Sequence, residues 1–543
     1  MNPVRLTSFL ALFSLVLAGF WMARISYIDP WYRNTDMNIH NTADALAINS
    51  GLPPNHIDQP GVPMKYLLAL DFRIRHSLGL LSVWNLKEFG LSPDPLREIP
   101  KLIRIGRVHS RILVLVFIVA AGCLVYTITT SREAAGLAVI LLCGCLPLLF
   151  HGLFTRPELL CVVFGNIIAL LCVWKSVLAT QRPQKHGWLL LAGIFCGLST
   201  LEKLPGICFL PFCFAGCCIG ALTSPQTSSK NTQEIASSES RFWDGLLPAG
   251  CSVSVLWLLF YLESYPNVLS HVAIFRLRLV AVVIAVTPII ALWHGSSRIW
   301  RFLQSRTIEA AVLGGGALLS LFLIYLCMRA VMSDITAADY MTRMIHYLFD
   351  PASTMKTLLD SSDTTLVLLQ YFQQNPFLFI STPILVLGIL FVRQVPLRIK
   401  ALITLVLLGA FGIALVMSNR HFTLHYSIFP QVPLLLVWAL SLSGLSNCIL
   451  NRNKSTPAIK WGHSAVAFLA FTFVLTAYPP LKQRYQNYQN DATLPVNDLT
   501  LTFLFDHDAH TATYLQIMRD HYGNRDEFKK LLEQFLNDPQ NRY

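Results

Sequence analysis

The first residue whose type and place could do chemistry is Asp36, in the segment DPWYRNTDMNIHNTADALAIN. It precedes a run with helical spacing, in which Ile39, Ala43 and Leu46 share an apolar face and Gly51 marks the end. A carboxylate in this place can act as a general base toward an acceptor hydroxyl or amine. An acid is also favoured at a helix start as an N-cap, so the spacing leaves both roles open.

A second polar turn follows at 56–61, with the sequence HIDQPG. Its His56 and Asp58 stand two residues apart, so in an extended segment both can reach a metal or a phosphate on one side. The Pro-Gly pair then leads into a second predicted helix, which has an apolar face over 64–70. An ordinary polar turn at the membrane interface is the alternative.

Two short turns between apolar runs carry further charges. In the turn at 155–158, Arg156 could pair with a phosphate and Glu158 could ligate a metal. The alternative is an interface ion pair that caps the next helix, because charges at the bilayer edge are costly unless they are used or snorkel to water. In the turn at 202–203, Lys203 could hold a lipid phosphate as a point charge, or it could belong to an ordinary ion pair.

Two later segments complete the set of candidate sites. Arg420 and Tyr426 lie in another short turn, and a guanidinium there suits bidentate contact with a diphosphate or phosphodiester. An anchored interface turn is again the alternative. The segment DHDAH at 506–510 has the residue types of a metal site, although a polar loop before a helix at 512–522 would look the same.

The composition places these residues in a membrane protein. Of the 543 residues, 54% are hydrophobic and only 13% are charged, and the mean hydropathy is +0.52. A soluble domain carries about 25% charged residues, so an ordinary cytosolic enzyme and a disordered chain are excluded. The net charge of +12 then reflects membrane topology and not a surface for nucleic acid. Most of the 13 cysteines lie in apolar runs and behave as small hydrophobic residues.

The apolar runs predict an all-α polytopic protein with about thirteen transmembrane helices. The predicted spans are 6–24, 111–130, 134–154, 158–178, 187–202, 206–223, 245–262, 277–294, 308–330, 377–393, 399–417, 428–447 and 462–478. With the N-terminus inside, sixteen Lys and Arg fall in inner segments and five in short outer loops. An odd number of spans then puts the C-terminus outside.

This topology gathers the candidate chemistry on one side of the membrane. A large first outer loop at 25–110 with juxtamembrane helices, a second outer loop at 331–376 and the short charged turns all face outside. We expect a catalytic transmembrane domain over 1–478, a disordered polar insert at 224–241 on the inner side, and a small outer segment at 479–543. The tail could bind an acceptor or cover the loops.

The layout resembles the GT-C superfamily of integral membrane glycosyltransferases, over about residues 6–445. That superfamily includes bacterial lipid A aminoarabinose transferases and protein O-mannosyltransferases. Asp36 matches the acid that follows the first span of its members, although Met37 stands where many have a second acid. The turns at 56–61, 155–158, 197–203 and 420–433 resemble its polar-Pro, Arg-Pro-Asp/Glu, Gly-Leu…Thr-Lys and Arg…Tyr…Pro motifs, with Glu202 inserted before the lysine.

The resemblance implies an inverting transfer of a sugar from a polyprenyl phosphate to a lipid, glycan or protein acceptor at the outer face. Asp36 would take the acceptor proton. The residues that would hold the donor phosphate are Arg156, Lys203, Arg420 and Tyr426, and those that would position the acceptor or ligate a divalent metal are His56, Asp58 and Glu158. The implied partners are the lipid-linked donor, the acceptor and membrane lipids.

Three other classes of function fit the sequence less well. A flippase or transporter would place charges at mid-span, with broken helices and repeats, and the sequence shows neither. An O-antigen ligase or polymerase would carry its largest outer loop late in the chain, whereas here it is the first. A structural subunit would have no use for the clustered polar groups. The single Asn-x-Ser/Thr site, at Asn453, falls in a predicted inner loop and favours a bacterial inner membrane.

Overall fold

The protein is an all-α membrane protein, seen here in a computed structural model. The structure describes residues 3–28, 30–54, 61–179, 181–222, 236–264, 271–293, 298–349, 369–373, 375–393, 395–417, 424–452, 464–477 and 512–541, with positions 479, 483, 501, 504 and 505. These residues contain helices and turns and no strand. The fold class predicted from hydropathy is therefore confirmed at the level of an all-α membrane protein.

A helical segment coincides with each of the thirteen predicted spans. They are α1 (Pro3–Ile28), α5 (Pro95–Thr129), α6 (Arg132–Cys143) with α7 (Leu146–His151), α8 (Pro157–Val162) with η2 (Val163–Ala169) and α9 (Leu170–Leu178), α10 (Arg182–Glu202), η3 (Leu204–Cys208) with α11 (Phe209–Leu222), α12 (Ala236–Glu263), α13 (His271–Trp293), α14 (Arg298–Arg329), α18 (Pro376–Phe391), α19 (Leu397–Met417), α20 (Ile428–Arg452) and Ser464–Ala477. Four described helices are long and apolar enough to cross a membrane by length and composition, and six more are apolar but shorter. Thirteen crossings and their orientation stay predictions.

Two boundaries differ from the sequence expectation. Helix α5 starts at Pro95, sixteen residues before the predicted span, with a proline in its first turn where no backbone donor is needed. Helix α12 starts at Ala236, so the last six residues of the polar insert are helical and the expectation of disorder was wrong for them. Both helices extend beyond their apolar windows because adding a residue to an existing helix is easier than starting one.

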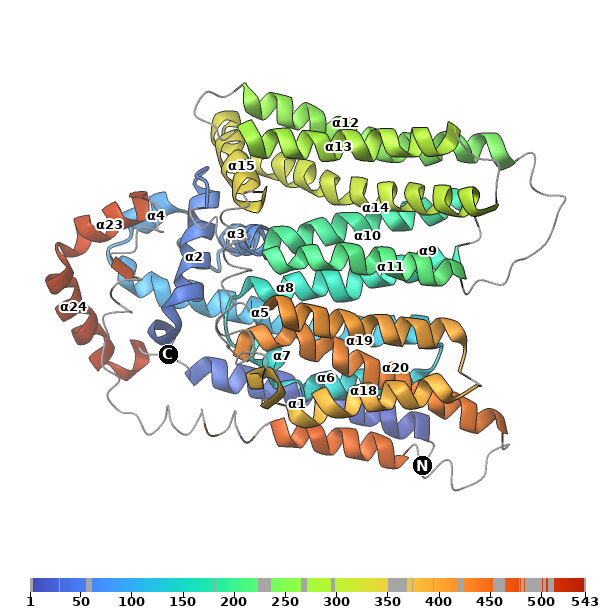
Figure 1. The fold of residues 1–543 in the computed structure, drawn as a ribbon. Coiled ribbons are helices and arrows are strands. Elements are labelled where there is room, and N and C mark those ends of the chain that lie inside the picture. The colour runs from blue at the N-terminus through green and yellow to red at the C-terminus, as the bar shows by residue number, and fades with distance from the viewer. Residues whose placement is uncertain are drawn as a thin grey trace.

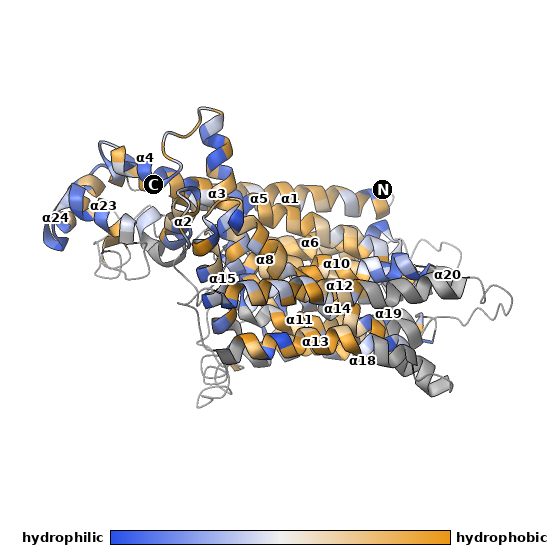
Figure 2. Ribbon diagram, turned by 90° about the horizontal axis from the view of Figure 1, so that it is seen from above, coloured by the Kyte–Doolittle hydropathy of each residue, from blue (hydrophilic) through white to orange (hydrophobic). Residues whose placement is uncertain are grey.

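The long loops gather at one end of the bundle. Figure 1 shows α2 (Thr35–Asn49), α3 (Val62–Ser77), α4 (Leu86–Leu91) and α15 (Asp334–Phe349) at the end opposite to the start of α1, and the tail helices α23 (Ala512–Tyr522) and α24 (Arg525–Asn537) lie beside them. Figure 2 shows hydrophilic residues concentrated at this end and hydrophobic residues along the bundle. The predicted helices after Asp36, after Gly61 and at 512–522 are therefore all present, on one side.

Helix α2 is enclosed and does not lie on a surface. Every residue from Asn38 to Ile48 is buried, the polar ones as well as the apolar ones. The sequence indicated one apolar face, over Ile39, Ala43 and Leu46, and the structure buries the polar face as well. The reason is that α3, α4 and α5 surround it, so its polar face meets protein groups instead of water.

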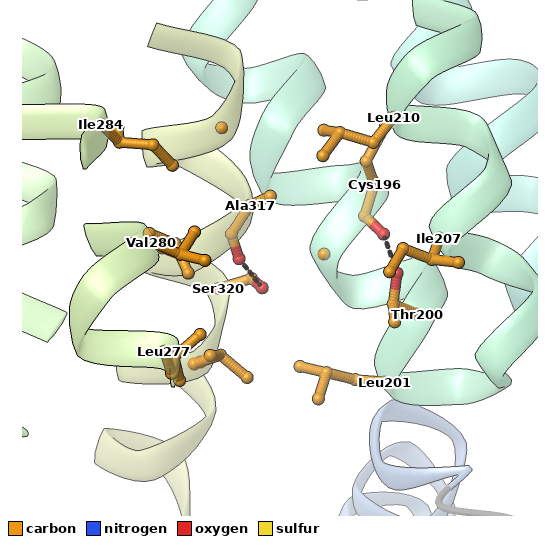
Figure 3. Close-up of a pocket in the computed structure, with 14 residues that line it drawn as sticks. Cys196, Thr200, Leu201, Ile207, Leu210, Leu277, Val280, Ile284, Ala317 and Ser320 are labelled. Carbon is orange, nitrogen blue, oxygen red and sulfur yellow. Dashed lines mark hydrogen bonds between the residues drawn. The ribbon is translucent and has the colours of Figure 1, made fainter. Parts of the chain in front are cut away.

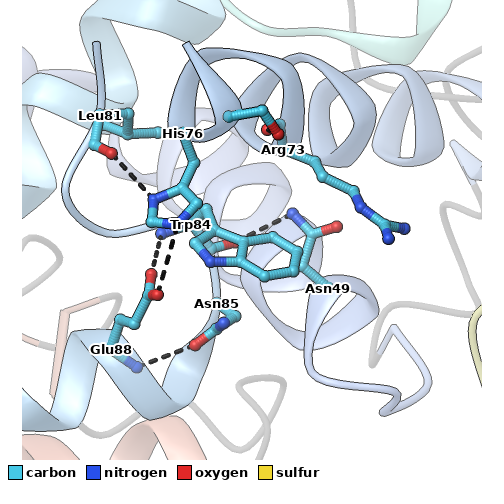
Figure 4. Close-up of polar contacts among 8 residues, drawn as sticks. Asn49, Arg73, His76, Leu81, Trp84, Asn85 and Glu88 are labelled. Carbon is cyan, nitrogen blue, oxygen red and sulfur yellow. Dashed lines mark hydrogen bonds and ion pairs between the residues drawn. The ribbon is translucent and has the colours of Figure 1, made fainter. Parts of the chain in front are cut away.

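The turn between α3 and α4 is held by side chains from three helices. Figure 4 shows His76 of α3 stacked on Trp84, with ring centroids 5.4 Å apart. His76 Nδ1 lies 3.0 Å from the Leu81 carbonyl, and Asn49 of α2 donates to the Trp84 carbonyl over 2.9 Å. These contacts join α2 and α3 to the turn that leads into α4.

The C-terminal tail covers the first loop. The hydroxyl of Tyr522, at the end of α23, donates to the Asp94 carboxylate and accepts from the Leu96 N–H, each over 2.7 Å. Trp31 Nε1 donates to the Asn541 carbonyl over 2.8 Å, which joins the far end of the tail to the start of the loop. Of the two roles left open by the sequence, the structure shows the covering one.

We expect Tyr522→Phe to loosen the tail without unfolding the bundle. Loss of a hydrogen bond to a charged group costs about 1.5–3 kcal/mol, and the Leu96 N–H also loses its acceptor. Amide hydrogen exchange in α23 should accelerate by about ten- to a hundredfold. Tyr126→Phe is the matched control, since that ring is 45% exposed on α5 and removes no hydrogen bond of the tail. Unchanged exchange in α23 would show that the tail is held by other contacts.

Candidate functional site

Helix α2 is docked on the turn that carries Arg156. The Asn38 Oδ1 accepts from the Thr155 N–H over 3.0 Å, and Asn41 Nδ2 donates to the Thr155 carbonyl over 2.8 Å. Asn38 and Asn41 are three residues apart and therefore share a helix face. Asp36 stands two residues before Asn38 as the second residue of α2, so the backbone of the predicted base lies at this turn.

Helix α3 starts against the same turn. Gly61 has a φ of +48°, and a Cβ built on it would lie 3.2 Å from the Pro157 Cβ. Its N–H donates to the Glu202 carbonyl over 3.1 Å. The first loop therefore returns to the membrane helices between the start of α8 and the end of α10, and only glycine fits this left-handed position without strain.

We expect Gly61→Ala to destabilise the protein by about 1–2 kcal/mol, because a side chain in left-handed backbone costs that much. Gly187→Ala in α10 is the control, since a Cβ there meets nothing within 4 Å. It should be neutral or slightly stabilising, because alanine favours a helix over glycine. Equilibrium unfolding in mixed detergent checks both. Equal effects would mean that Gly61 is not selected for its conformation.

The turns at 155–158 and 202–203 meet in a buried ion pair. Lys203 Nζ pairs with Glu158 Oε1, and the two side chains are 3% and 0% exposed. The ammonium also lies 4.5 Å from the Tyr426 ring centroid and 3.4 Å from its hydroxyl. Tyr426 comes from η4 (Leu424–Ser427), so three turns that are far apart in sequence converge on one cation.

Arg156 completes this cluster but is only loosely paired. Its Nη1 lies 3.7 Å from Glu158 Oε1, and its side chain is 10% exposed. The Nε atom is buried and has no hydrogen-bond partner among the described residues. A buried guanidinium donor without an acceptor is rare in proteins and needs an explanation, of which a bound anion is one.

A second buried ion pair lies in the first loop. Lys65 Nζ of α3 is 2.9 Å from Asp44 Oδ2 of α2, and each side chain is 2% exposed. Lys65 also acts electrostatically on Glu202, which is fully buried at the end of α10. The hydroxyl of Tyr340, from α15, is beside this pair. Burial and then the Asp44 charge raise the pKa of Tyr340 above its ordinary value, so that hydroxyl stays neutral.

An apolar cavity opens on the other side of the turn that carries Lys203. It has a volume of about 210 Å³, and its lining is almost entirely apolar. Figure 3 shows side chains of α13 and α14 on one side of it and those of α10, η3 and α11 on the other. Leu201 and Ile207, on either side of the 202–206 turn, both line it. The 202–206 turn therefore borders both the apolar cavity and the buried ammonium of Lys203.

The structure brings together four of the eight predicted site residues. Arg156, Glu158, Lys203 and Tyr426 are in contact, and the start of α2, which holds Asp36, is docked on the same turn. The side chain of Asp36 lies outside the described residues, and so do His56, Asp58, Arg420 and the segment 506–510. The roles assigned to all eight stay predictions.

Sequence reasoning missed the pair of Asp44 and Lys65. Asp44 gave no signal, because it lies about 100° around the helix from Ala43 and off the predicted apolar face. Lys65 did give one, because it interrupts the apolar run at 64–70. Charges at core-facing positions are rarely tolerated unless they are paired. Asn38 and Asn41 were also missed, although their spacing on one helix face was visible.

The described residues do not fit a divalent metal. Within the described part of the chain, no three His, Cys, Asp or Glu side chains lie close enough together to hold one. Of the three residues predicted to ligate a metal, Glu158 is the one whose side chain the structure describes. Lys203 and Arg156 already neutralise its charge. No step of the reaction is therefore assigned to a metal here, and the metal predicted at His56 and Asp58 lies outside the described residues.

Comparison with known proteins gives a remote structural likeness. Two solved structures of the oligosaccharyltransferase of Archaeoglobus fulgidus, one in the apo form and one in complex with Zn and sulfate, each match with a TM-score of 0.40. The sequence identities are 15% and 14%, over 93% and 96% of this chain but only 60% and 57% of those chains. The chain thus spans about three fifths of their length, and a likeness this remote does not define an activity. No family model and no curated protein matches.

Proposed function

We propose that this protein is a GT-C type membrane glycosyltransferase, which moves a sugar from a polyprenyl-phosphate carrier to an acceptor. The observation that carries the proposal is the buried, loosely paired Arg156 beside Lys203, at a turn that also borders the apolar cavity. Two buried cations beside an apolar cavity suit a donor that has a phosphate head and an isoprenoid tail. The motif resemblance at these turns supports the same class.

The donor phosphate would share the cations that Glu158 now holds. Arg156 offers its unpaired Nε, and Lys203 offers an ammonium fixed by Glu158 and the Tyr426 ring. Arg420 is proposed as a further cation. As the bond between the sugar and the phosphate breaks, the leaving phosphate takes the electron pair, and these fixed positive charges stabilise it.

Asp36 is proposed as the general base. It would accept the proton of the acceptor hydroxyl or amine while that atom forms the new bond to the sugar carbon, with inversion. Two hydrogen bonds dock α2 on the Thr155 backbone next to Arg156, so the start of α2 is fixed relative to the cations. The reaction would take place at the outer face of a bacterial inner membrane.

The test is mass spectrometry of envelope lipids, glycans and proteins from a deletion strain and from the same strain with the wild-type chain restored. The proposal expects one sugar-bearing species to vanish on deletion and to return on restoration, and its mass would identify both sugar and acceptor. No change in any sugar-bearing species between the two strains would contradict the transferase and would favour a flippase.

A further inference from the structure

Helix α5 carries an exposed stripe that changes from cationic to apolar. Its first half carries Arg97, Lys101, Arg104 and Arg111, in steps of three, four or seven residues that keep them on one helix face. The first three are exposed and Arg111 is half-buried. The adjoining face of the helix continues with Ile112, Val116 and Val119, which are 54%, 57% and 45% exposed. An exposed apolar stripe on a span-length helix is a surface for lipid chains, so the cations stand at its headgroup end.

Among the described residues, the two cations nearest the start of α5 have carboxylate partners. Arg97 pairs with Asp94 at 3.1 Å, and Lys101 pairs with Glu98 at 2.9 Å. Arg104 and Arg111 form no ion pair with any described residue. The two unpaired arginines are therefore the ones next to the apolar half, about 10.5 Å apart along the helix.

A neighbouring helix supplies a further polar group at the same level. Helix α1 packs beside α5, and the two run together at one edge of the bundle in Figure 2. Tyr27 of α1 is 69% exposed and acts electrostatically on Arg104. Aromatic residues with a polar end are typical of the membrane interface, where their hydroxyl meets the headgroups.

We propose that Arg104 and Arg111 bind the phosphate of an anionic phospholipid, in the leaflet at the end of the bundle that carries α2 and α3. A guanidinium at the border between polar and apolar surroundings gains most from a phosphate, which it can contact with two parallel hydrogen bonds. The acyl chains lie along Ile112 and Val116. This surface is separate from the proposed transfer site and does not depend on it.

The test is native mass spectrometry of the purified full chain in neutral detergent, with phosphatidylglycerol and phosphatidylcholine of the same acyl chains. The wild type should retain phosphatidylglycerol preferentially. Arg104→Gln with Arg111→Gln should weaken that preference by about ten- to thirtyfold, since each basic residue near a charged membrane contributes roughly a factor of five. Arg97→Gln with Lys101→Gln, which removes the paired cations, should leave most of the preference intact.

Two results would overturn the proposal. One is equal retention of both lipids by the wild type, and the other is an equal loss in the two double variants, which would indicate general attraction to positive charge. If the double glutamine variant does not fold, the variant Arg104→Lys with Arg111→Lys replaces it in the test. It keeps both positive charges but removes the planar guanidinium groups that can make two parallel hydrogen bonds. It should then show an intermediate loss of preference, and full wild-type preference would contradict phosphate contact by these guanidinium groups.

Discussion

Lys203→Met is expected to destabilise the protein by about 3–5 kcal/mol and to abolish transfer. Removing the lysine takes away the cation that pairs with the fully buried Glu158 carboxylate, and among the described residues Arg156, at 3.7 Å, is the cation that remains. Loss of a fixed cation at the leaving phosphate should lower the rate by about a hundred- to a thousandfold. Equilibrium unfolding in mixed detergent measures the first effect, and the amount of sugar-bearing product measures the second.

The double variant Glu158→Gln with Lys203→Met separates the structural from the functional role. With both charges removed, no carboxylate is left uncompensated at this position, so stability should recover most of the loss. Activity should stay lost, because the cation is still absent. A double variant that regains both stability and activity would show that this ion pair only holds the turns together.

Lys65→Met should also cost about 3–5 kcal/mol, for a related reason. Lys65 is the cation paired with Asp44 at 2.9 Å, and its removal leaves a buried carboxylate without that cation. The same unfolding measurement checks the size of the loss. In this case the double variant Asp44→Asn with Lys65→Met should recover much of the stability and, with it, the activity, since neither residue is assigned to the reaction.

The activity of the Asp44→Asn with Lys65→Met variant shows whether the ion pair of Asp44 and Lys65 belongs to the reaction site. If Asp44→Asn with Lys65→Met folds normally but makes no product, this pair belongs to the reaction site and the assignment of Lys203 alone is incomplete. Comparing both double variants in one strain background removes differences in expression and substrate supply. Membrane levels of each variant, measured by immunoblot, are the control.

Much of the architecture could be predicted from the spacing of apolar residues and from the glycines that follow helices. The helix after Asp36 ends before Gly51, which has a φ of +74°, and the helix at 512–522 matches α23. The reason is that the end of a helix depends on residues that are adjacent in sequence, such as a glycine directly after an apolar periodic run. The gathering of the charged turns at one end followed from counting the spans between them.

Pairing inside the site could not be predicted in this way. Lys203 follows Glu202 directly, yet it pairs with Glu158, which is 45 residues earlier. Neighbouring residues at a helix end point in different directions, so partners are chosen by the packing of distant helices. The burial of α2 was missed for the same reason, since enclosure by α3, α4 and α5 is a tertiary event that no single segment encodes.

The central claim is tested most directly by restoring the deletion strain with Asp36→Asn and measuring the sugar-bearing species by mass spectrometry. Asparagine keeps the size of the side chain and its ability to cap a helix, but it cannot take the acceptor proton. At equal membrane levels of the protein, the account predicts that the species stays at least a hundredfold below the wild-type strain. Full restoration by Asp36→Asn would contradict it and would leave Asp36 with the role of a helix-start residue.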